Sequence, residues 1–167
     1  MYIVSECLLG GKCKYNGGDN LSPSVCEFLK GREYIKICPE EMGGLTTPRP
    51  PAEIQPDGRV INKEGTDVTS SFRKGADLAL AKVIGALLRQ ADESVCAAEL
   101  SSSGSLRTLQ GDEVTAILKA NSPSCGCGTI YDGSFTGRLI PGYGLTAGLF
   151  RKNGIRLMTE KDFEGER

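Results

Sequence analysis

The sequence predicts an α/β fold in which a small, mainly parallel sheet is flanked by helices and carries a β-hairpin insertion. Strand-like apolar runs alternate with helix-like stretches, which is the pattern of parallel α/β sheets. The strand-like runs are residues 2–6, 34–38, 114–120 and 155–160. The hairpin is expected in residues 55–69, with turns at Asp57-Gly58 and Glu64-Gly65. In open parallel sheets, ligands bind outside the carboxyl ends of the strands.

The first predicted strand leads into a glycine-rich loop at residues 7–20 and then a short helix at residues 22–31. That helix has a serine as N-cap, a proline in its first turn and a glycine at its end, which are start and stop signals. Pro39 halts the second strand. Residues 39–53 are rich in proline, and we expect an extended loop there that cannot be a helix.

A long helix is predicted over residues 71–91, with either Asp67 or Thr69 as its cap. Apolar residues recur there near helical spacing. They include Leu78, Val83 and Leu87.

The second half of the chain is richer in turns. Residues 91–112 form a polar connection, with a short helix expected near residues 94–100. Residues 130–144 predict a hairpin or an extended arm, because turn signals are frequent there. Residues 145–154 predict a helix that ends at a glycine, and the tail at residues 161–167 is expected to be loose.

Length and charge limit the class of protein. A chain of 167 residues predicts one domain over residues 1–167, long enough to bury a core without staples. The formal net charge of -1 offers no basic excess, so we expect no nucleic-acid partner. No apolar run approaches the length of a membrane span, and the start of the chain lacks the charged region of a signal peptide. We therefore expect no membrane partner and a cytoplasmic location.

Cysteine is abundant in this chain and histidine is absent. The sequence has seven cysteines and no histidine. In a reducing cytoplasm, many cysteines more often indicate metal binding or catalysis than disulfides. Without histidine, the usual general base and every histidine-containing zinc site are excluded. Acid–base chemistry must therefore use other side chains.

Three of the cysteines, Cys7, Cys38 and Cys125, end or follow predicted strands. If those strands are parallel neighbours, the three thiols gather at one edge of the sheet. Glycines beside them let the backbone approach a bound group, and prolines stiffen the loops. The alternative is that they are buried structural cysteines, since free cysteine is among the most buried residue types. Their shared position at strand ends favours a metal site.

The other four cysteines have weaker signals. Cys26 and Cys96 lie in helical contexts and are expected to be core residues or bystanders. Cys13 could supply a fourth ligand or lie behind the ligands, and Cys127 could be a redox-active or reserve thiol. Four thiolates would indicate structural zinc, but local CxxC pairs are absent. Three well-separated thiolates suit a 4Fe-4S cluster with one open iron, which can act as a Lewis acid.

Three motifs carry a resemblance to a known family. They are SECLLGGKCKYNGG at residues 5–18, ICPEEMGGLTTPRPPAE at residues 37–53 and NSPSCGCGTIYDGSFTG at residues 121–137. The set closely resembles the family known as domain of unknown function 523 (DUF523), which includes bacterial thiouracil desulfidases. The resemblance covers most of the chain, residues 2–75 and 113–159.

The resemblance implies a desulfidase enzyme with an oxygen-sensitive 4Fe-4S cluster held by Cys7, Cys38 and Cys125. It implies desulfuration of a thiolated pyrimidine such as thiouracil without net redox change, releasing sulfide, with the open iron binding the substrate sulfur. The acid–base residues of the family fall on Glu40 and Ser122, which agrees with the absence of histidine. Glu40 could activate a water or protonate the leaving group.

Both acid–base candidates have plainer interpretations. Glu40 could be a loop carboxylate in solvent or a partner of Arg49, and Ser122 could be a cap or turn hydroxyl. Arg49 could line the pocket, but bracing its loop by bonding carbonyl groups is the simpler role. The same choice between pocket residue and plain turn holds for Tyr15, Asn16, Asp132, Gly133 and residues 142–144.

One segment departs from the family pattern. About twenty additional residues, roughly 90–112, separate the long helix from the third strand and carry Cys96. This insertion could cover the site, form a contact surface or be an inert surface excursion, which is the default expectation.

Other functions remain open beside the desulfidase. The chain could be a non-catalytic metal or iron-sulfur module, as a sensor or a structural zinc site, or it could be a cluster carrier. A non-catalytic module would be indifferent to Glu40→Ala and Ser122→Ala, whereas a desulfidase would not. The expected substrate is a small thiolated base or nucleoside, and the expected state is a monomer or a homodimer.

Overall fold

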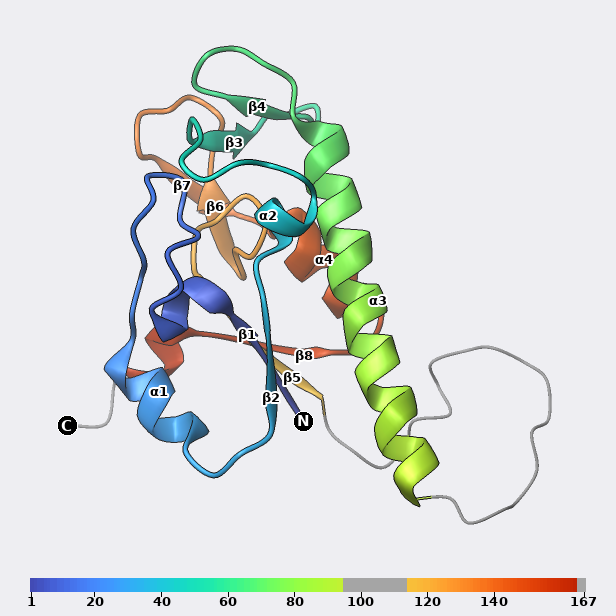
Figure 1. Ribbon diagram of the computed structural model, residues 1–167. Coiled ribbons are helices and arrows are strands. Elements are labelled where there is room, and N and C mark those ends of the chain that lie inside the picture. The colour runs from blue at the N-terminus through green and yellow to red at the C-terminus, as the bar shows by residue number, and fades with distance from the viewer. Residues whose placement is uncertain (95–113, 165–167) are drawn as a thin grey trace, which may run out of the picture.

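Four parallel strands form the main sheet. The structure is a computed structural model that describes residues 1–94 and 114–164. The strands lie in the order β2-β1-β5-β8 (Figure 1). Their bounds are Tyr2–Ser5 for β1, Tyr34–Ile37 for β2, Thr115–Leu118 for β5 and Arg156–Thr159 for β8. The predicted α/β class and its parallel sheet are therefore confirmed.

The neighbouring strands pair so that their carboxyl ends are nearly level. Ser5 pairs with Ile37 across β1 and β2, and Val4 pairs with Ile117 across β1 and β5. All four strands run in the same direction, so the loops that follow them leave from one edge of the sheet. The predicted thiols meet at that edge.

Helices cover both faces of this sheet (Figure 1). One face packs against α3 (Thr69–Ser94) and α4 (Leu145–Lys152), and the other against α1 (Pro23–Leu29) and the 3-10 helix η1 (Glu6–Leu9). In β1, Ile3 packs in the first of these cores and Val4 in the second, and both are fully buried. Burial on both faces is typical of a parallel sheet.

Pro39 begins a helical turn. α2 spans Pro39–Met42, inside the stretch 39–53 that we predicted to be a loop that cannot be helical. That prediction is wrong for these four residues, because proline is tolerated at the first position of a helix, where its missing N–H has no partner in any case. The Met42 N–H donates to the Cys38 carbonyl at 2.9 Å and closes the turn.

α3 begins two residues before the predicted stretch. The Asp67 carboxylate accepts the N–H of Thr69 at 2.9 Å, whereas the Thr69 hydroxyl accepts the N–H of Val60 at 2.9 Å. The buried face of α3 includes Phe72, Ala76, Ala79, Val83 and Leu87. Leu78, which we grouped with this apolar set, is 42% exposed, because it lies beside the buried stripe rather than on it.

Two antiparallel hairpins lie beyond the carboxyl edge of the main sheet (Figure 1). They are β3 (Ala52–Ile54) with β4 (Val60–Asn62), and β6 (Thr129–Tyr131) with β7 (Leu139–Pro141). The first confirms the hairpin predicted in residues 55–69, although its first strand lies just before that stretch. The second confirms the hairpin alternative for residues 130–144.

The C-terminal segment is more ordered than predicted. Residues 161–163, expected to be loose, belong to η3 (Glu160–Phe163). Asp162 Oδ2 accepts the N–H of Thr159 at 2.6 Å and forms a capping box, which fixes this turn. The helix predicted near residues 94–100, including Cys96, lies almost entirely outside the described residues, as does most of the segment 90–112. Across the described helices, none is long and apolar enough to cross a membrane.

Candidate metal centre and active site

A cavity of about 530 Å³ opens at the carboxyl edge of the sheet. Residues that follow β1, β2 and β5 line it, together with parts of the two hairpins. Four cysteines are among the lining residues: Cys7, Cys13, Cys38 and Cys125. The structure therefore brings together the three thiols that the strand order predicted to converge, and it adds Cys13.

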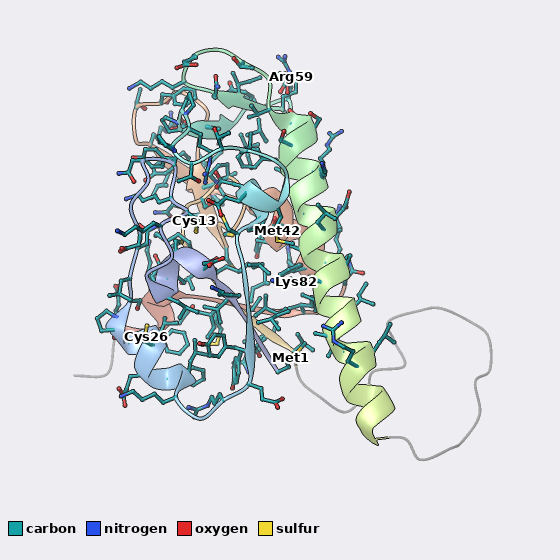
Figure 2. The ribbon with its side chains drawn as sticks, viewed as in Figure 1. Met1, Cys13, Cys26, Met42, Arg59 and Lys82 are labelled. Carbon is teal, nitrogen blue, oxygen red and sulfur yellow. The ribbon has the colours of Figure 1, made fainter. Side chains whose placement is uncertain are left out.

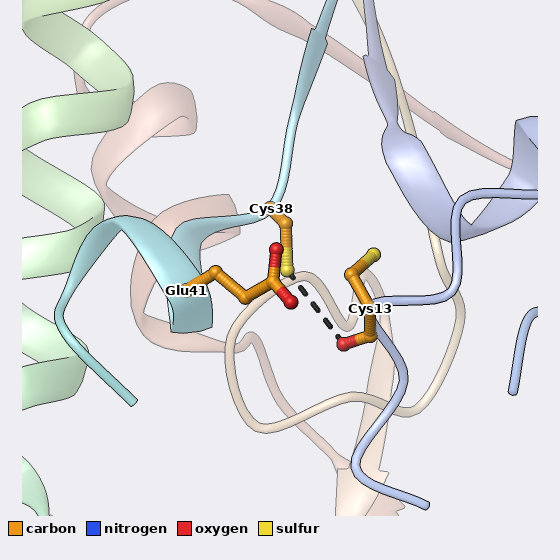
Figure 3. A group of neighbouring side chains, drawn as sticks. All are labelled: Cys13, Cys38 and Glu41. Carbon is orange, nitrogen blue, oxygen red and sulfur yellow. Dashed lines mark hydrogen bonds between the residues drawn. The ribbon is translucent and has the colours of Figure 1, made fainter. Parts of the chain in front are cut away.

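Cys13 lies between two of these thiols. Its Sγ, the Sγ of Cys38 and a carboxylate oxygen of Glu41 all lie within 4.8 Å of one another. Figure 3 shows Glu41 and Cys38 on the α2 side of this group and Cys13 on the facing loop, whose carbonyl lies 3.9 Å from the Cys38 Sγ. Hydrogen bonding to Cys38, and then to Cys7, raises the pKa of the Cys13 thiol.

The thiols on either side of Cys13 have lowered pKa values. A hydrogen bond with Cys13 is the main cause that lowers the pKa of Cys7 to about 7, against the opposing effect of burial. The pKa of Cys38 is lowered first by its own hydrogen bond with Cys13 and also by the backbone N–H of Glu41. Both residues are thus disposed toward the thiolate, which is the form that binds metals.

Cys125 lies deepest in the site. It is buried, and that burial raises the pKa of its thiol, while a hydrogen bond with Ser5 opposes the shift. The negative charges of Cys7, Glu40 and Cys38 also act on it, because all four groups line the same cavity. Burial disfavours the Cys125 thiolate, and a bound cation would offset that effect, because a cysteine that binds a metal must first lose its proton.

Two glycines let α2 lie directly against α3 and so fix Cys38. A Cβ atom on Gly75 of α3 would lie 1.9 Å from the Pro39 carbonyl oxygen, and one on Gly43 would lie 2.1 Å from the Ser71 carbonyl oxygen. Such distances exclude any side chain larger than hydrogen. The backbone contact anchors the turn that carries Glu40 and Glu41.

Glu40 forms an ion pair with Arg49 inside the cavity wall. Arg49 Nε lies 2.8 Å from Glu40 Oε2, and the two side chains are 6% and 18% exposed respectively. Arg49 Nη2 also donates to the Cys13 carbonyl at 2.9 Å, and Nη1 donates to the Thr47 hydroxyl at 2.8 Å. Both plain interpretations therefore hold, since Arg49 pairs with Glu40 and braces the loops. One guanidinium connects the carboxylate to the loop that carries Cys13.

Ser122 organises the loop that carries Cys125. Its Oγ accepts the N–H of Ser124 and the N–H of Cys125, each at 3.1 Å. This is the turn role expected of a serine before proline, yet Ser122 also lines the cavity. A hydroxyl has two acceptor sites and one donor hydrogen. Because two N–H groups use the acceptor sites, the hydroxyl is left to act as a donor.

Several residues of this site were missed in the sequence. Lys119 and Glu160 form an ion pair beside the cavity, and the Ala120 N–H donates to the other Glu160 oxygen at 2.8 Å. The Lys119 N–H donates to the Ser5 hydroxyl at 3.0 Å, so the ends of β1 and β5 are joined beneath Cys125. The position of Lys119, directly after an apolar strand, could have indicated a site residue. Nothing in the sequence indicated its partner Glu160, 41 positions later.

The remaining candidates divide between the site and its surroundings. Arg49 and Tyr15 line the cavity, whereas Asn16 and Asp132 accept N–H bonds within their own turns. Cys26 lies on α1, away from Cys13 in Figure 2, and its thiol faces the Leu8 carbonyl at 3.8 Å. Cys26 and Cys127 are absent from the described cavity lining. Neither the reserve role of Cys127 nor the bystander role of Cys26 is tested by this arrangement.

Comparison with known proteins identifies the family. A family model described as 2-thiouracil desulfurase matches residues 2–162. The chain belongs to the 2-thiouracil desulfurase family. This membership confirms the resemblance to DUF523 that the three motifs predicted, and it confirms the prediction of an enzyme of the desulfidase type.

Two similar proteins cover nearly the whole chain. A solved structure, described as the 4Fe-4S-dependent thiouracil desulfidase TudS (DUF523Vcz), is 37% identical and has a TM-score of 0.74. The likeness covers 98% of this chain and 92% of that one. The uncharacterized protein YbbK of Bacillus subtilis (strain 168) is 34% identical over 171 residues, which is 97% of each chain. The fold and the family are therefore shared over almost the full length.

Proposed function

We propose that this protein is an iron-sulfur-dependent desulfidase that removes sulfur from a thiolated pyrimidine such as thiouracil and releases sulfide. Thiouracil and water give uracil and hydrogen sulfide, so atoms balance and no electrons are gained or lost. The observation that carries the proposal is one cavity lined by cysteine thiols together with Glu40 and Ser122. The identity of 37% to a protein described as a 4Fe-4S-dependent thiouracil desulfidase supports it.

The donor set fits an iron-sulfur cluster. Cys7, Cys38 and Cys125 line one cavity, and thiolates are the usual ligands of such clusters. We assign these three thiols as the protein ligands of a 4Fe-4S cluster. When bound, a cluster with three protein ligands supplies an iron with an open position, a Lewis acid suited to a thiocarbonyl sulfur.

Cys13 takes a supporting role in this proposal. Its thiol lies within hydrogen-bonding reach of both Cys7 and Cys38, and interaction with them raises its pKa. Hydrogen bonds to ligand sulfurs tune the potential of iron-sulfur clusters, and such neighbours orient the ligands. Cys13 is therefore assigned as a hydrogen-bonding neighbour of the two ligands rather than as a ligand itself.

Glu40 is assigned as the residue that accepts a proton from the attacking water. Arg49 holds Glu40 Oε2 at 2.8 Å and is itself fixed by the Cys13 carbonyl, so the carboxylate is held in one orientation at the cavity wall. A general base needs this kind of fixed placement within hydrogen-bond reach of the proton that it takes. The water's oxygen would attack the thiolated carbon, and the carbon–sulfur bond would break.

Ser122 is assigned as a hydrogen-bond donor to the substrate. Its two acceptor sites are taken by the N–H groups of Ser124 and Cys125. The hydroxyl hydrogen is then directed to an acceptor, and a pyrimidine ring offers both nitrogen and carbonyl oxygen atoms. A donor fixed in this way stabilises negative charge that develops on the ring during attack.

We also infer where the enzyme works and what it takes. Six free cysteines are present in the described residues, four of them in one cavity, and such a set persists as thiols in a reducing compartment, which favours the cytoplasm. The cavity volume of about 530 Å³ lies within the range of small-molecule sites. A thiolated base or a nucleoside is thus the proposed substrate, acted on by a monomer or a homodimer.

Sulfide release from 2-thiouracil tests this function. The protein would be purified and reconstituted with iron and sulfide without oxygen. Wild type is expected to release sulfide, and Cys7→Ser, Cys38→Ser and Cys125→Ser are each expected to release none. Cys26→Ser, on α1, is the matched control and is expected to keep the activity. An iron-loaded wild type that releases no sulfide from any thiolated pyrimidine would contradict the proposal.

A second candidate, a metal-binding module without turnover, has one observation in its favour. The ligand atoms of Cys13, Cys38 and Glu41 lie within 4.8 Å of one another, a grouping that a single zinc ion could use. In that case zinc would be lost from Cys13→Ser and retained by Cys125→Ser. The proposed desulfidase instead predicts that iron is retained in Cys13→Ser and lost from Cys125→Ser.

A further inference from the structure

The connection between β6 and β7 holds an aromatic residue in an unusual backbone conformation at the cavity. Phe135 has a φ of 56° and is one of the residues that line the cavity. Left-handed φ values are rare for bulky residues, because the side chain crowds the following backbone. Such strain persists only when surrounding contacts enforce it, and it concentrates at functional sites.

The enforcing contacts come from the other hairpin. Glu53 Oε2, on β3, accepts the N–H of Phe135 and the N–H of Gly133, each at 3.0 Å. Glu53 is 8% exposed, so this is a buried carboxylate whose hydrogen bonds are with backbone. Gln55 Nε2 donates to the Gly133 carbonyl at 3.0 Å. Three hydrogen bonds thus hold residues 133–135 against β3 and Gln55, the residue that follows it.

The backbone at Gly133 packs tightly against β3. A Cβ atom on Gly133 would lie 2.9 Å from the Ile54 carbonyl oxygen, and Gly133 has a φ of 89°. The backbone of the turn therefore lies directly against β3, and Phe135 is fixed where it borders the cavity. A loop that needed only to close a hairpin would not require a buried carboxylate from a strand about 80 positions earlier.

We propose that Phe135 binds the substrate ring by stacking, and that Glu53 is a positioning residue that holds Phe135 in place. This inference rests on the proposed function, because the thiolated pyrimidine supplies the flat ring. Aromatic side chains stack on heteroaromatic bases, and Tyr131 and Tyr15 also line this cavity. Phe135 is half-buried, so part of its surface remains available to a ligand.

Kinetics of reconstituted holoenzyme with 2-thiouracil test the stacking role. Phe135→Leu keeps apolar bulk but removes the aromatic face, and it is expected to raise KM about tenfold with little change in kcat. Phe135→Tyr is expected to restore the wild-type KM. Glu53→Ala is expected to raise KM as Phe135→Leu does, whereas Glu53→Gln, which keeps an acceptor oxygen, changes it less. Tyr143→Leu, outside the cavity lining, is the control.

Binding of uracil, measured by calorimetry on the same proteins, separates this inference from the proposed function. Uracil has no sulfur, so its affinity reports ring recognition whether or not sulfide is released. Weaker uracil binding by Phe135→Leu with intact binding by Phe135→Tyr supports stacking. Equal uracil affinity in wild type and Phe135→Leu, or no uracil binding by wild type, overturns it. If Phe135→Leu loses its fold, Phe135→Met replaces it in both measurements.

Discussion

The thiol edge, defined by the loops that carry Cys7, Cys38 and Cys125, differs from the hairpin pair β3–β4 and β6–β7 in how its geometry arises. The thiol edge follows from the order and direction of the main-sheet strands, because parallel strands end together. The hairpin pair depends on contacts such as Glu53 with Phe135, which join distant parts of the chain. In the proposed function, the first region carries the chemistry and the second shapes the space for the substrate.

Outside the proposed cluster ligands, the largest expected effect comes from Glu40 and Ser122, to which the proposed function assigns proton transfer and charge stabilisation at the thiol edge. Glu40→Gln and Ser122→Ala are each expected to lower kcat by about a hundredfold or more, because proton transfer and charge stabilisation are lost. Iron content should stay at the wild-type level in Glu40→Gln, whereas it should fall in Ser122→Ala, because the Ser122 hydroxyl also accepts the N–H of Cys125. The kcat of each variant is therefore expressed per bound iron. Glu27→Gln, an exposed carboxylate on α1 outside the cavity lining, is the control. Steady-state sulfide release with iron analysis measures all three.

The next prediction compares a glycine-to-alanine substitution at the contact of α3 with α2 with the same substitution elsewhere on α3. Gly75→Ala forces a Cβ into the Pro39 carbonyl oxygen, 1.9 Å away, and should lower the free energy of unfolding by about 3 kcal/mol. Iron retention should fall as well, because α2 begins directly after Cys38. Gly85→Ala, whose Cβ would have only a 3.6 Å contact with Arg89, should be neutral or stabilising by up to about 1 kcal/mol. Urea unfolding measures both, and equal changes would refute the packing argument.

Arg49 links the two sides of the thiol edge, and its loss should be smaller than that of Glu40. Arg49→Met leaves Glu40 without its partner in a largely buried place, so kcat should fall about tenfold through misplacement of the carboxylate. The free energy of unfolding should fall by about 3 kcal/mol, because a buried pair is broken. Arg59→Met, which removes an exposed ion pair, is the control for charge loss. An unchanged kcat in Arg49→Met would contradict the proposal that Arg49 must hold the Glu40 carboxylate in place for proton transfer.

The smallest effect tests the hairpin pair itself. Gly133→Ala combines a positive φ with a close contact to Ile54, whereas Gly58→Ala has a positive φ and open space around its Cβ. Gly133→Ala should therefore lower the free energy of unfolding by about 1 kcal/mol more than Gly58→Ala. It should raise KM for 2-thiouracil and leave iron content unchanged. Loss of iron in Gly133→Ala would contradict the separation of roles between the two regions.

The thiol edge could be read from the sequence because its signals are local. Apolar runs marked the strands, and Cys7, Cys38 and Cys125 lay at their ends or within a few residues after them. The helical turn at Pro39 was missed because proline is favoured at the first position of a helix but disrupts later positions, and the sequence alone did not show which position Pro39 takes. Leu78 was misread because helical spacing alone does not fix which face of α3 is buried.

The hairpin pair could be read only in part. The Asp57-Gly58 turn signalled the first hairpin, since that dipeptide favours a tight turn. Nothing near Glu53 or Phe135 indicated their hydrogen bond, because the two lie 82 positions apart. The ion pair of Lys119 with Glu160 was missed for the same reason. Sequence patterns predict elements, whereas contacts between hairpins depend on how the elements pack.

The most direct test of the central claim is the amount of iron and acid-labile sulfide per chain, measured on protein purified and reconstituted without oxygen. The account predicts about four of each, with an iron-sulfur absorption spectrum. Both should be lost together in Cys7→Ser, Cys38→Ser and Cys125→Ser, and both should be retained in Cys26→Ser. Zinc alone, with no iron or sulfide retained after reconstitution, would contradict the account.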